Sequence, residues 1–323
     1  MSTAFLYPGQ GSQKVGMGAE LLQTEGDLLT DYVRQAEAAS GQPIRKIMLE
    51  GPIEALTRTE VAQPALFCVS LAVSDAARAR GLQPDYVAGH SLGEYTAAAA
   101  SGAISVEDGI ELVSLRGRLM GEIGDERPGA MAAVIGLDDA ALEEVCADVA
   151  DKGIVGPANY NSPGQTVISG ELSALTAAIE LAVERGARKV VRLAISIASH
   201  SPVMRSASDQ FSQALARVGL SDAAVPVVAN ISARAITSAE DIRRELAEQI
   251  TGSVRWSQSI KAMIEDGVQT IVEIGPGDAL SGISRRISRD LPAFSINSVE
   301  AIGQLPSRLQ ELELRRVRGV GAG

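Results

Sequence analysis

The chain has 323 residues, a formal net charge of -11 and only two histidines. The acidic balance argues against nucleic-acid binding and against attachment to an anionic membrane surface, since both favour basic faces. No run of about 18 uncharged apolar residues predicts a membrane span, and the N-terminus does not resemble a secretory signal. We therefore expect a cytoplasmic protein of one large domain or two, long enough to bury a large hydrophobic core.

Cysteine and histidine usage argues against a metal site. Cys68 and Cys146 lie far apart in apolar patterns, which indicates buried thiols rather than a disulfide. Two histidines and the absence of a Cys-x-x-Cys run make a zinc site improbable. We expect no metal and no redox cofactor.

The first predicted strand covers residues 5–7 and runs into the glycine-rich turn Pro8-Gly9-Gln10-Gly11-Ser12-Gln13. The glycines indicate backbone that approaches another group closely, although an ordinary tight turn is the alternative. Helices are predicted over about 28–39 and 63–80, with Pro64 in the first turn of the second, where proline is tolerated.

The next segment holds the most informative motif, Gly89-His90-Ser91-Leu92-Gly93. It fits the Gly-x-Ser-x-Gly elbow, which presents a serine between a strand and a helix. Residues 86–88 are predicted as a buried strand and residues 93–100 as a helix, so the local context is the required one. Backbone N–H groups at such a helix start can stabilise an oxyanion. A purely structural turn is the alternative, because the motif alone also occurs by chance.

A capping box at Ser105-Val106-Glu107-Asp108 predicts a helix that continues to about residue 123. From residue 129 to 193 the pattern changes to strands at 130–135, 154–159, 166–169 and 189–193, with helices at 138–149 and 172–185. This β-α-β-β-α-β order is the ferredoxin-like signature. We expect an α/β core, residues 1–127 and 199–323, interrupted by a small ferredoxin-like subdomain, residues 128–198.

The second histidine, His200, lies in a small-residue loop just after this predicted insert. His90 adjoins Ser91 on a tight turn, so their side chains should diverge. By elimination, His200 is the candidate base for a Ser91 nucleophile. Base and nucleophile would then meet in the cleft between the two subdomains. Beyond this loop, helices are predicted at 204–218, 238–250, 256–265 and 279–287, and strands at 225–228 and 270–274.

Six blocks in order resemble one known family. They are Pro8-Gly9-Gln10-Gly11-Ser12-Gln13, Gly89-His90-Ser91-Leu92-Gly93-Glu94-Tyr95, Arg116-Gly117, the run 158–165 (Ala-Asn-Tyr-Asn-Ser-Pro-Gly-Gln), His200-Ser201-Pro202, and Glu273-Ile274-Gly275-Pro276-Gly277. Together they look like the malonyl-CoA:acyl carrier protein transacylases, and the acyltransferase domains of polyketide synthases are similar. The resemblance covers about residues 4–287 and implies an α/β-hydrolase-like core with a ferredoxin-like insert.

The resemblance also implies roles for matched positions. Ser91 would be the acylated nucleophile and His200 its base, with the backbone carbonyl of Gln249 orienting the histidine in place of an aspartate. The N–H groups of Gln10 and Leu92 would form the oxyanion hole. Arg116 would hold the malonyl carboxylate, for which a planar guanidinium is well suited. Its alternative is a solvent-facing arginine on an amphipathic helix, as we expect for Arg118.

The run 158–165 makes Asn159, Asn161 and Gln165 weaker candidates for the site, because turn chemistry alone explains the Asn161-Ser162-Pro163-Gly164 segment. Ser199 is a departure from the family pattern. Malonyl-selective members usually carry phenylalanine just before the histidine, and serine is similar to the pattern in acyltransferases that take methylmalonyl units. We therefore expect malonyl-CoA as the main substrate, with some tolerance of α-substituted malonyl groups.

The implied reaction is ping-pong transfer of a malonyl group from malonyl-CoA to the thiol of acyl carrier protein. Because carrier proteins are acidic, a local basic patch must overcome the net charge of -11. Two groups of residues are candidates: Arg188, Lys189 and Arg192, and Arg285, Arg286 and Arg289. A serine hydrolase, a non-catalytic carrier-docking subunit, and a loader for a polyketide synthase or a malonate decarboxylase are the alternatives. No coiled-coil heptads are present, and we expect a monomer.

Overall fold

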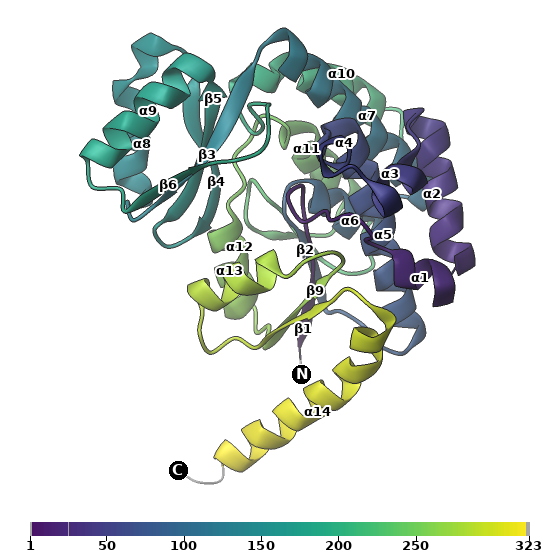
Figure 1. Ribbon diagram of the computed structural model, residues 1–323. Helices are drawn as coiled ribbons and strands as arrows, with labels where there is room; N and C mark the ends of the chain where they lie inside the picture. The colour runs from purple at the N-terminus through teal and green to yellow at the C-terminus, as the bar shows by residue number, and fades with distance from the viewer. Residues whose placement is uncertain (1, 25, 321–323) are drawn as a thin grey trace.

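Two β-sheets organise the chain (Figure 1). The computed structural model describes residues 2–24 and 26–320, and of residues 315–320 it describes the backbone alone. The larger sheet has the strand order β10-β9-β1-β2-β7-β8 and the smaller one the order β4-β5-β3-β6. The strands of the larger sheet are β1 (Thr3–Tyr7), β2 (Tyr86–Gly89), β7 (Val227–Val228), β8 (Ala235–Ile236), β9 (Thr270–Ile274) and β10 (Ala293–Ile296).

The larger sheet is parallel except for β8, which pairs antiparallel with β7. Its central strand β1 is buried along its whole length, and alternate residues of a strand point to opposite faces. Phe5 and Tyr7 accordingly join the main hydrophobic core, whereas Ala4 and Leu6 join a second core on the other face. Helices therefore cover both faces, as a buried parallel sheet requires.

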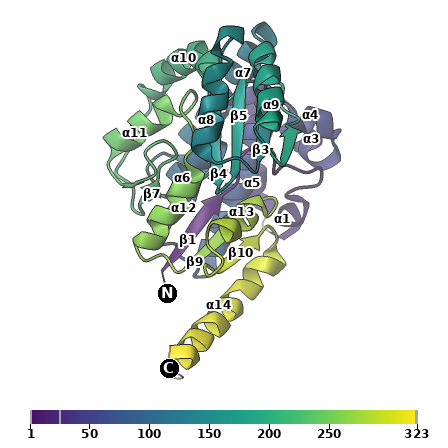
Figure 2. The same ribbon diagram turned by 90° about the vertical axis from the view of Figure 1, so that its left-hand side faces the viewer.

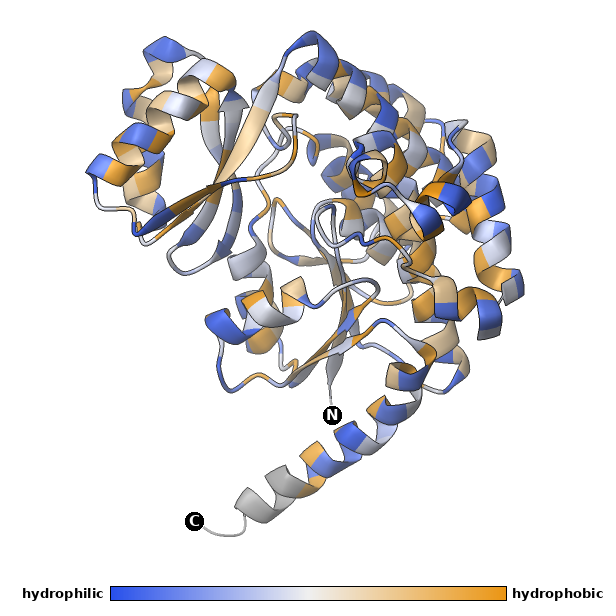
Figure 3. Cartoon of the chain, in the orientation of Figure 1, coloured by the Kyte–Doolittle hydropathy of each residue, from blue (hydrophilic) through white to orange (hydrophobic). Residues whose placement is uncertain are grey.

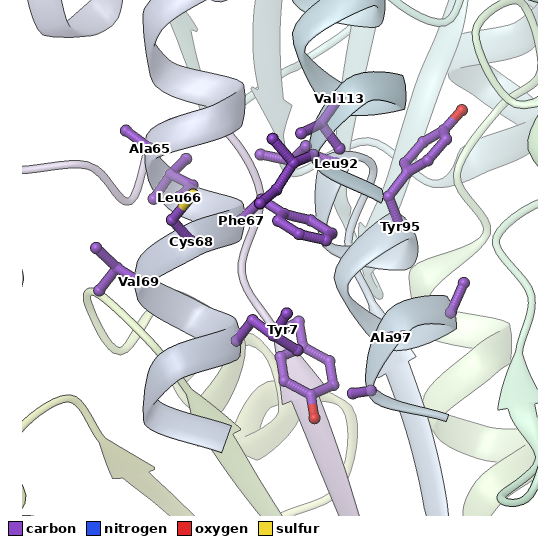
Figure 4. Packing of buried hydrophobic residues seen from close by; sticks show 14 of the residues in the cluster. Tyr7, Ala65, Leu66, Phe67, Cys68, Val69, Leu92, Tyr95, Ala97 and Val113 are labelled. Carbon is purple, nitrogen blue, oxygen red and sulfur yellow. The ribbon is translucent and has the colours of Figure 1, made fainter. Parts of the chain in front are cut away.

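One face of this sheet carries most of the helices (Figures 1 and 2). They are α1 (Ala19–Thr24), α2 (Gly26–Ser40), α3 (Ile44–Glu50), α4 (Ile53–Thr57), α5 (Thr59–Ala79), α6 (Leu92–Ala100), α7 (Val106–Glu126), α10 (Arg205–Leu215) and α11 (Ala239–Glu248). The other face carries α12 (Trp256–Glu265) and α13 (Ala279–Ile287). Figure 4 shows Tyr7 at the end of β1 near Phe67 of α5, with Leu92 and Tyr95 of α6 beside them. Hydrophobic residues gather along the strands and the inner faces of these helices (Figure 3).

The smaller sheet is antiparallel and comprises β3 (Gly129–Ile135), β4 (Val155–Ser162), β5 (Gln165–Glu171) and β6 (Lys189–Arg192). Helices α8 (Asp139–Asp148) and α9 (Leu172–Glu184) pack on the face formed by Ala130, Ala132, Val134 and Ile168. The alternate residues, Met131, Ala133 and Val167, form a small separate cluster on the opposite face. That face is turned toward the larger sheet.

Two backbone hydrogen bonds join β4 of the smaller sheet to the segment that follows α11. The Tyr160 N–H of β4 donates to the carbonyl of Val254, and the Val254 N–H donates to the carbonyl of Ala158, both at 2.8 Å. The strand of the smaller sheet is thereby fixed against the segment that follows α11. Asn159, between the two bonded residues of β4, lines the cavity described below.

Most of the predicted elements are present, with shifted ends. The helix predicted from residue 63 begins at Thr59, so Pro64 lies beyond the first turn and not within it. The predicted turn at Asn161-Ser162 is wrong for these two residues, which continue β4, and only Pro163 and Gly164 turn. The sequence reading missed α1, α3, α4, β8, β10 and α14 (Val299–Val320), along with the short 3₁₀ turns Ala150–Lys152 and Pro202–Met204. The missed strands are short, so period-two alternation has little length in which to appear.

Helix α14 extends away from the body of the molecule (Figures 1 and 2). Its first turns pack through Ile302 and Leu305, which are buried in the main core. Within the part of the chain that the structure describes, no helix is both long enough and apolar enough to cross a bilayer.

Candidate active site

Ser91 occupies a sharp turn between β2 and α6. Its φ of 52° lies in the left-handed region, which is unfavourable for a non-glycine residue. The flanking glycines are required by close approach: a Cβ on Gly93 would lie 2.0 Å from the Tyr7 oxygen, and one on Gly89 would lie 1.9 Å from the Gly93 carbonyl. The elbow predicted from the sequence is therefore present, with the serine at a helix N-terminus.

His200 reaches this serine from 109 residues further along the chain. Its Nε2 lies 2.7 Å from the Ser91 Oγ. Its Nδ1 lies 3.0 Å from the Gln249 carbonyl oxygen and 2.9 Å from the Gly252 carbonyl oxygen. Because carbonyls only accept, Nδ1 must carry the ring proton and Nε2 must be the free acceptor facing the serine hydroxyl.

The imidazole of His200 is held neutral. It is buried, and that burial lowers its pKa from 6.5 to about 3, with the positive charge of Arg116 as the next cause. A neutral imidazole whose acceptor nitrogen faces a hydroxyl can take the hydroxyl proton. Gly252 was not anticipated from the sequence, because a backbone carbonyl leaves no mark on residue type.

Arg116 of α7 is 1 % exposed and lies beside the nucleophile. Its NH2 donates to the Ser91 Oγ at 3.2 Å and to the Gln249 Oε1 at 2.9 Å, and its NH1 donates to the Gln63 Oε1 at 2.8 Å. The guanidinium also lies 5.3 Å from the centre of the Tyr95 ring. The expected alternative, a solvent-facing arginine, is wrong for Arg116 and right for Arg118, whose side chain is 55 % exposed and pairs with Glu122.

No carboxylate pairs with the charge of Arg116 in the part of the chain that the structure describes. Among the residues that the structure describes, no acidic side chain lies within ion-pair distance of its guanidinium, and its Nε has no hydrogen-bond partner. Burial lowers its pKa from the ordinary value. A buried charge without a counter-ion is costly, so an anionic group bound here would be strongly favoured.

Asn230 and Glu94 hold the turn that carries Ser91 in place through hydrogen bonds. The sequence analysis assigned no role to either residue. The Asn230 side chain accepts from the Ser91 N–H at 2.8 Å and donates to the Gly89 carbonyl at 2.7 Å. Glu94 accepts from the Asn230 N–H at 2.8 Å. Glu94 stands in the quoted elbow motif, so a signal existed for it, but Asn230 lies 139 residues from Ser91 in a loop that carries no motif.

Two backbone N–H groups at the site make no hydrogen bond within the described residues. They belong to Gln10, in the loop after β1, and Leu92, the first residue of α6. The Gln10 side chain is anchored separately, through its Nε2 to the Thr57 carbonyl at 3.0 Å. Free N–H groups beside a nucleophile can stabilise negative charge on a reacting oxygen.

A cavity of about 590 Å³ brings most of the predicted residues together. Its lining includes Gln10, Ser91, Arg116, Asn159, Asn161, Gln165, Ser199 and His200. The smaller sheet closes one side with Met131, Ala133 and Val167. The predicted residues Leu92 and Gln249 are not among the lining residues. The cavity is thus shared by both sheets, as the sequence predicted.

His90 does not contact Ser91 through its ring, as expected from their adjacency. Its Nε2 lies 2.9 Å from the Asn161 Oδ1, and its ring packs edge-on against Trp256 at 5.4 Å. Burial lowers its pKa. Asn161 therefore contacts the elbow across the cavity, whereas Gln165 contacts Arg286 of α13 at the rim.

A hydroxyl activated by a neutral imidazole, free N–H groups and a buried unpaired guanidinium define an enzyme that transfers acyl groups through serine. The acyl transferase domain family matches residues 4–313, and this chain belongs to that family.

Relatives with known names support this assignment. The chain is 40% identical over 309 residues to the malonyl CoA-acyl carrier protein transacylase of Bacillus subtilis (strain 168), covering 95% of this chain and 97% of that protein. It is 38% identical over 300 residues to the transacylase of the same name from Escherichia coli (strain K12), covering 93% and 97%.

Solved structures agree. The malonyl-CoA:acyl carrier protein transacylase of Xanthomonas oryzae pv. oryzae has a TM-score of 0.88 at 42% identity, over 92% of this chain and 96% of that one. A malonyl-transacylase solved in complex with its type II PKS acyl-carrier protein has a TM-score of 0.90 at 37% identity, over 94% and 98%. The mixed α/β fold with two sheets is therefore that of the family.

Proposed function

We propose that this chain transfers a malonyl group from malonyl-CoA to the phosphopantetheine thiol of an acyl carrier protein, for fatty acid or polyketide synthesis. The observation that carries the substrate class is the uncompensated Arg116 guanidinium, buried 3.2 Å from the Ser91 Oγ. It fits an acyl group that ends in a carboxylate. The relatives named above are transacylases for this acyl group and this acceptor.

In the first half-reaction the Ser91 hydroxyl attacks the thioester carbonyl while His200 Nε2 takes its proton. Negative charge develops on the carbonyl oxygen, where the N–H groups of Gln10 and Leu92 would form the oxyanion hole. Collapse of this intermediate breaks the carbon–sulfur bond. His200 then returns the proton to the departing CoA sulfur, and a malonyl ester of Ser91 remains.

The second half-reaction runs in reverse with a different thiol. His200 takes the proton of the phosphopantetheine thiol, whose sulfur attacks the Ser91 ester, and the serine oxygen regains the proton as it leaves. The Gln249 carbonyl, with that of Gly252, keeps the imidazole in the required tautomer in both halves. This chemistry needs no metal and no redox cofactor.

Arg116 would bind the malonyl carboxylate and so select against acetyl groups. An acetyl group would leave the buried guanidinium unpaired, which costs roughly 3–5 kcal/mol, a factor of more than a hundred in selectivity. A serine hydrolase with broad specificity would have no need of this cation. A subunit that only docks carrier proteins would need neither Ser91, His200 nor Arg116.

We further infer that the fold is an α/β-hydrolase-like core, residues 1–127 and 199–323, with a ferredoxin-like subdomain inserted at 128–198. Support comes from the elbow that follows β2 of a parallel sheet. The order β6-β3-β5-β4, with α8 and α9 on one face, supports the insert. We expect a cytoplasmic monomer, and both cysteines are free and buried.

Two basic patches remain candidates for carrier-protein docking. Arg188, Lys189 and Arg192 lie exposed on the edge strand β6 or just before it, and Arg285, Arg286 and Arg289 lie exposed on or after α13. Arg286 contacts Gln165, which lines the cavity, and Arg192 lies next to Leu193, which also lines it. Both patches would therefore flank the route that a phosphopantetheine arm takes into the cavity.

Ser199 supports a broader substrate range. It lines the cavity directly before His200, at the position where a phenylalanine ring would occupy space. We infer some tolerance of α-substituted malonyl groups, and comparison of kcat/KM for malonyl-CoA and methylmalonyl-CoA tests it. A preference for malonyl above about a thousandfold, some 4 kcal/mol, would exclude that tolerance.

The decisive experiment is intact-mass spectrometry after the protein is mixed with malonyl-CoA. We expect an added malonyl mass that Ser91→Ala abolishes and that the matched control Ser196→Ala retains. Addition of holo acyl carrier protein should then move the mass to the carrier. Release of malonate to water at the same rate without a carrier would instead identify a hydrolase.

A further inference from the structure

Glu94 is a buried carboxylate whose contacts reach both Ser91 and Arg116 without touching the cavity. It lies in the first turn of α6 and is 1 % exposed. One oxygen accepts from the Asn230 N–H at 2.8 Å, and the other accepts from the Gln249 Nε2 at 2.6 Å. Both neighbours are therefore donors to it.

The Gln249 side chain carries this contact onward to the reacting groups. Its Nε2 also donates to the Ser91 carbonyl at 2.7 Å, and its Oε1 accepts from the Arg116 NH2 at 2.9 Å. An amide has two distinct ends, and here only one orientation satisfies all three partners. If the amide flipped, its NH2 would face the donating guanidinium and its oxygen would face two acceptors.

We propose that Glu94 is a positioning residue that sets the selectivity for carboxylated acyl groups, by fixing the Gln249 amide so that its oxygen holds Arg116. This inference rests on the proposed function. An ionised carboxylate suits the task because it offers two acceptor oxygens and no donor. The carboxylate bonds Gln249 and not the guanidinium, so the unpartnered Nε of Arg116 stays available to substrate.

The pKa of the Glu94 carboxyl is raised well above its ordinary value, mainly by burial and then by the neighbouring Glu245. The two donor contacts and the charge of Arg116 act in the opposite direction. The contacts that position Ser91, through Asn230, and Arg116, through Gln249, thus both lead to this one buried acid.

Glu94→Gln tests the proposal. The backbone N–H of Asn230 cannot turn away, so the oxygen of the substituted side chain must face it and the new NH2 group must face Gln249. The Gln249 amide then flips and loses its bond to Arg116. We expect the ratio of kcat/KM for malonyl-CoA to that for acetyl-CoA to fall by about tenfold or more.

The ratio is the readout because both values come from one enzyme sample, so a loss of folded protein cancels. Glu94→Asp keeps two acceptor oxygens and should retain a higher ratio than Glu94→Gln. The matched control is Glu245→Gln, a neighbouring buried acid whose carboxylate accepts from the Ile231 N–H and the Ser232 hydroxyl. The bond of Gln249 to this residue is made to its backbone carbonyl, which the substitution keeps. Its ratio should match that of the unchanged protein.

Two outcomes overturn the proposal: a ratio for Glu94→Gln within about twofold of the unchanged protein, or an equal fall in Glu245→Gln. These outcomes are separate from failure of the proposed function. If the unchanged protein forms no malonyl ester on Ser91, the function is wrong. If it forms the ester and Glu94→Gln keeps the selectivity, only the role of Glu94 is wrong.

Discussion

The two sheets contribute different things to one cavity. The larger sheet, with the helices and loops around it, supplies the groups that can react or carry charge, namely Ser91, His200 and Arg116, each tied by hydrogen bonds. The smaller sheet supplies an apolar wall, with Met131 and Val167, and the amides of Asn159 and Asn161. The reacting and charged groups lie on one side of the cavity and the wall that shapes it on the other. Substitutions on the two sides should therefore have different effects on activity.

Loss of the base should give the largest difference between the two sides. We expect His200→Ala to slow formation of the Ser91 ester by about 10⁴-fold, as removal of one member of a catalytic triad does. Asn161→Ala on the smaller sheet should slow it by about tenfold, since it removes one hydrogen bond to His90. Stopped-flow acylation with malonyl-CoA measures both. Equal losses in the rate of ester formation would mean that residues of both sheets take part in the reaction.

Loss of the buried cation should change selectivity more than reactivity. We expect Arg116→Ala to lower the malonyl-to-acetyl ratio of kcat/KM by about a hundredfold, equivalent to about 2.8 kcal/mol. Arg118→Ala, in the same helix but exposed, is the control and should leave the ratio unchanged. Equal losses for both acyl groups after Arg116→Ala would contradict the carboxylate-binding role.

The elbow should be less tolerant of added volume than the outer strand of the smaller sheet. Gly93→Ala places a methyl group 2.0 Å from the Tyr7 oxygen, and we expect a loss of about 3 kcal/mol in the free energy of unfolding. A methyl group at Gly156 in β4 meets nothing within 4 Å. Gly156→Ala should therefore change stability by less than about 0.5 kcal/mol. Urea unfolding compares the two, and similar losses would mean that the elbow can relax.

The acyl carrier protein could dock on the basic patch of the smaller sheet or on the basic patch at α13. A charge reversal should slow transfer to carrier protein by about fivefold at low salt, with the effect fading as salt rises. We would compare Lys189→Glu on β6 with Arg286→Glu on α13. The variant with the larger, salt-dependent loss identifies the docking patch. Losses that do not depend on salt would argue against electrostatic docking at either.

A change of pH should have the smallest effect on activity. Because burial holds the pKa of His200 at about 3, its imidazole stays neutral and competent between pH 5 and 8. We expect kcat/KM for acylation to vary less than about twofold across that range, whereas a histidine of pKa 6.5 would lose roughly thirtyfold by pH 5. A fall with a midpoint near pH 6.5 would show that the base is solvated. Because the pKa of His200 is lower in the folded than in the unfolded chain, only the unfolded chain binds this proton as the pH falls below 6.5. The free energy of unfolding should therefore decrease below pH 6.5.

The sequence alone determined the local features of this protein. A strand, the run Gly89–Gly93 and a helix are contiguous, so their geometry follows from backbone sterics and periodicity. The scarcity of histidine left His200 as the one partner for Ser91. The alternation of the segments between 129 and 193 indicated the small sheet for the same local reason.

Only the tertiary structure decided what lies beneath the nucleophile. The contacts of Ser91 with Asn230 and of Glu94 with Gln249 join residues 139 and 155 positions apart. No residue pattern marks such a pairing, nor the Gly252 carbonyl that helps to fix the tautomer of His200. Local interactions specify turns and helices within a few residues, whereas burial and hydrogen-bond satisfaction act between segments that meet only when the chain has folded.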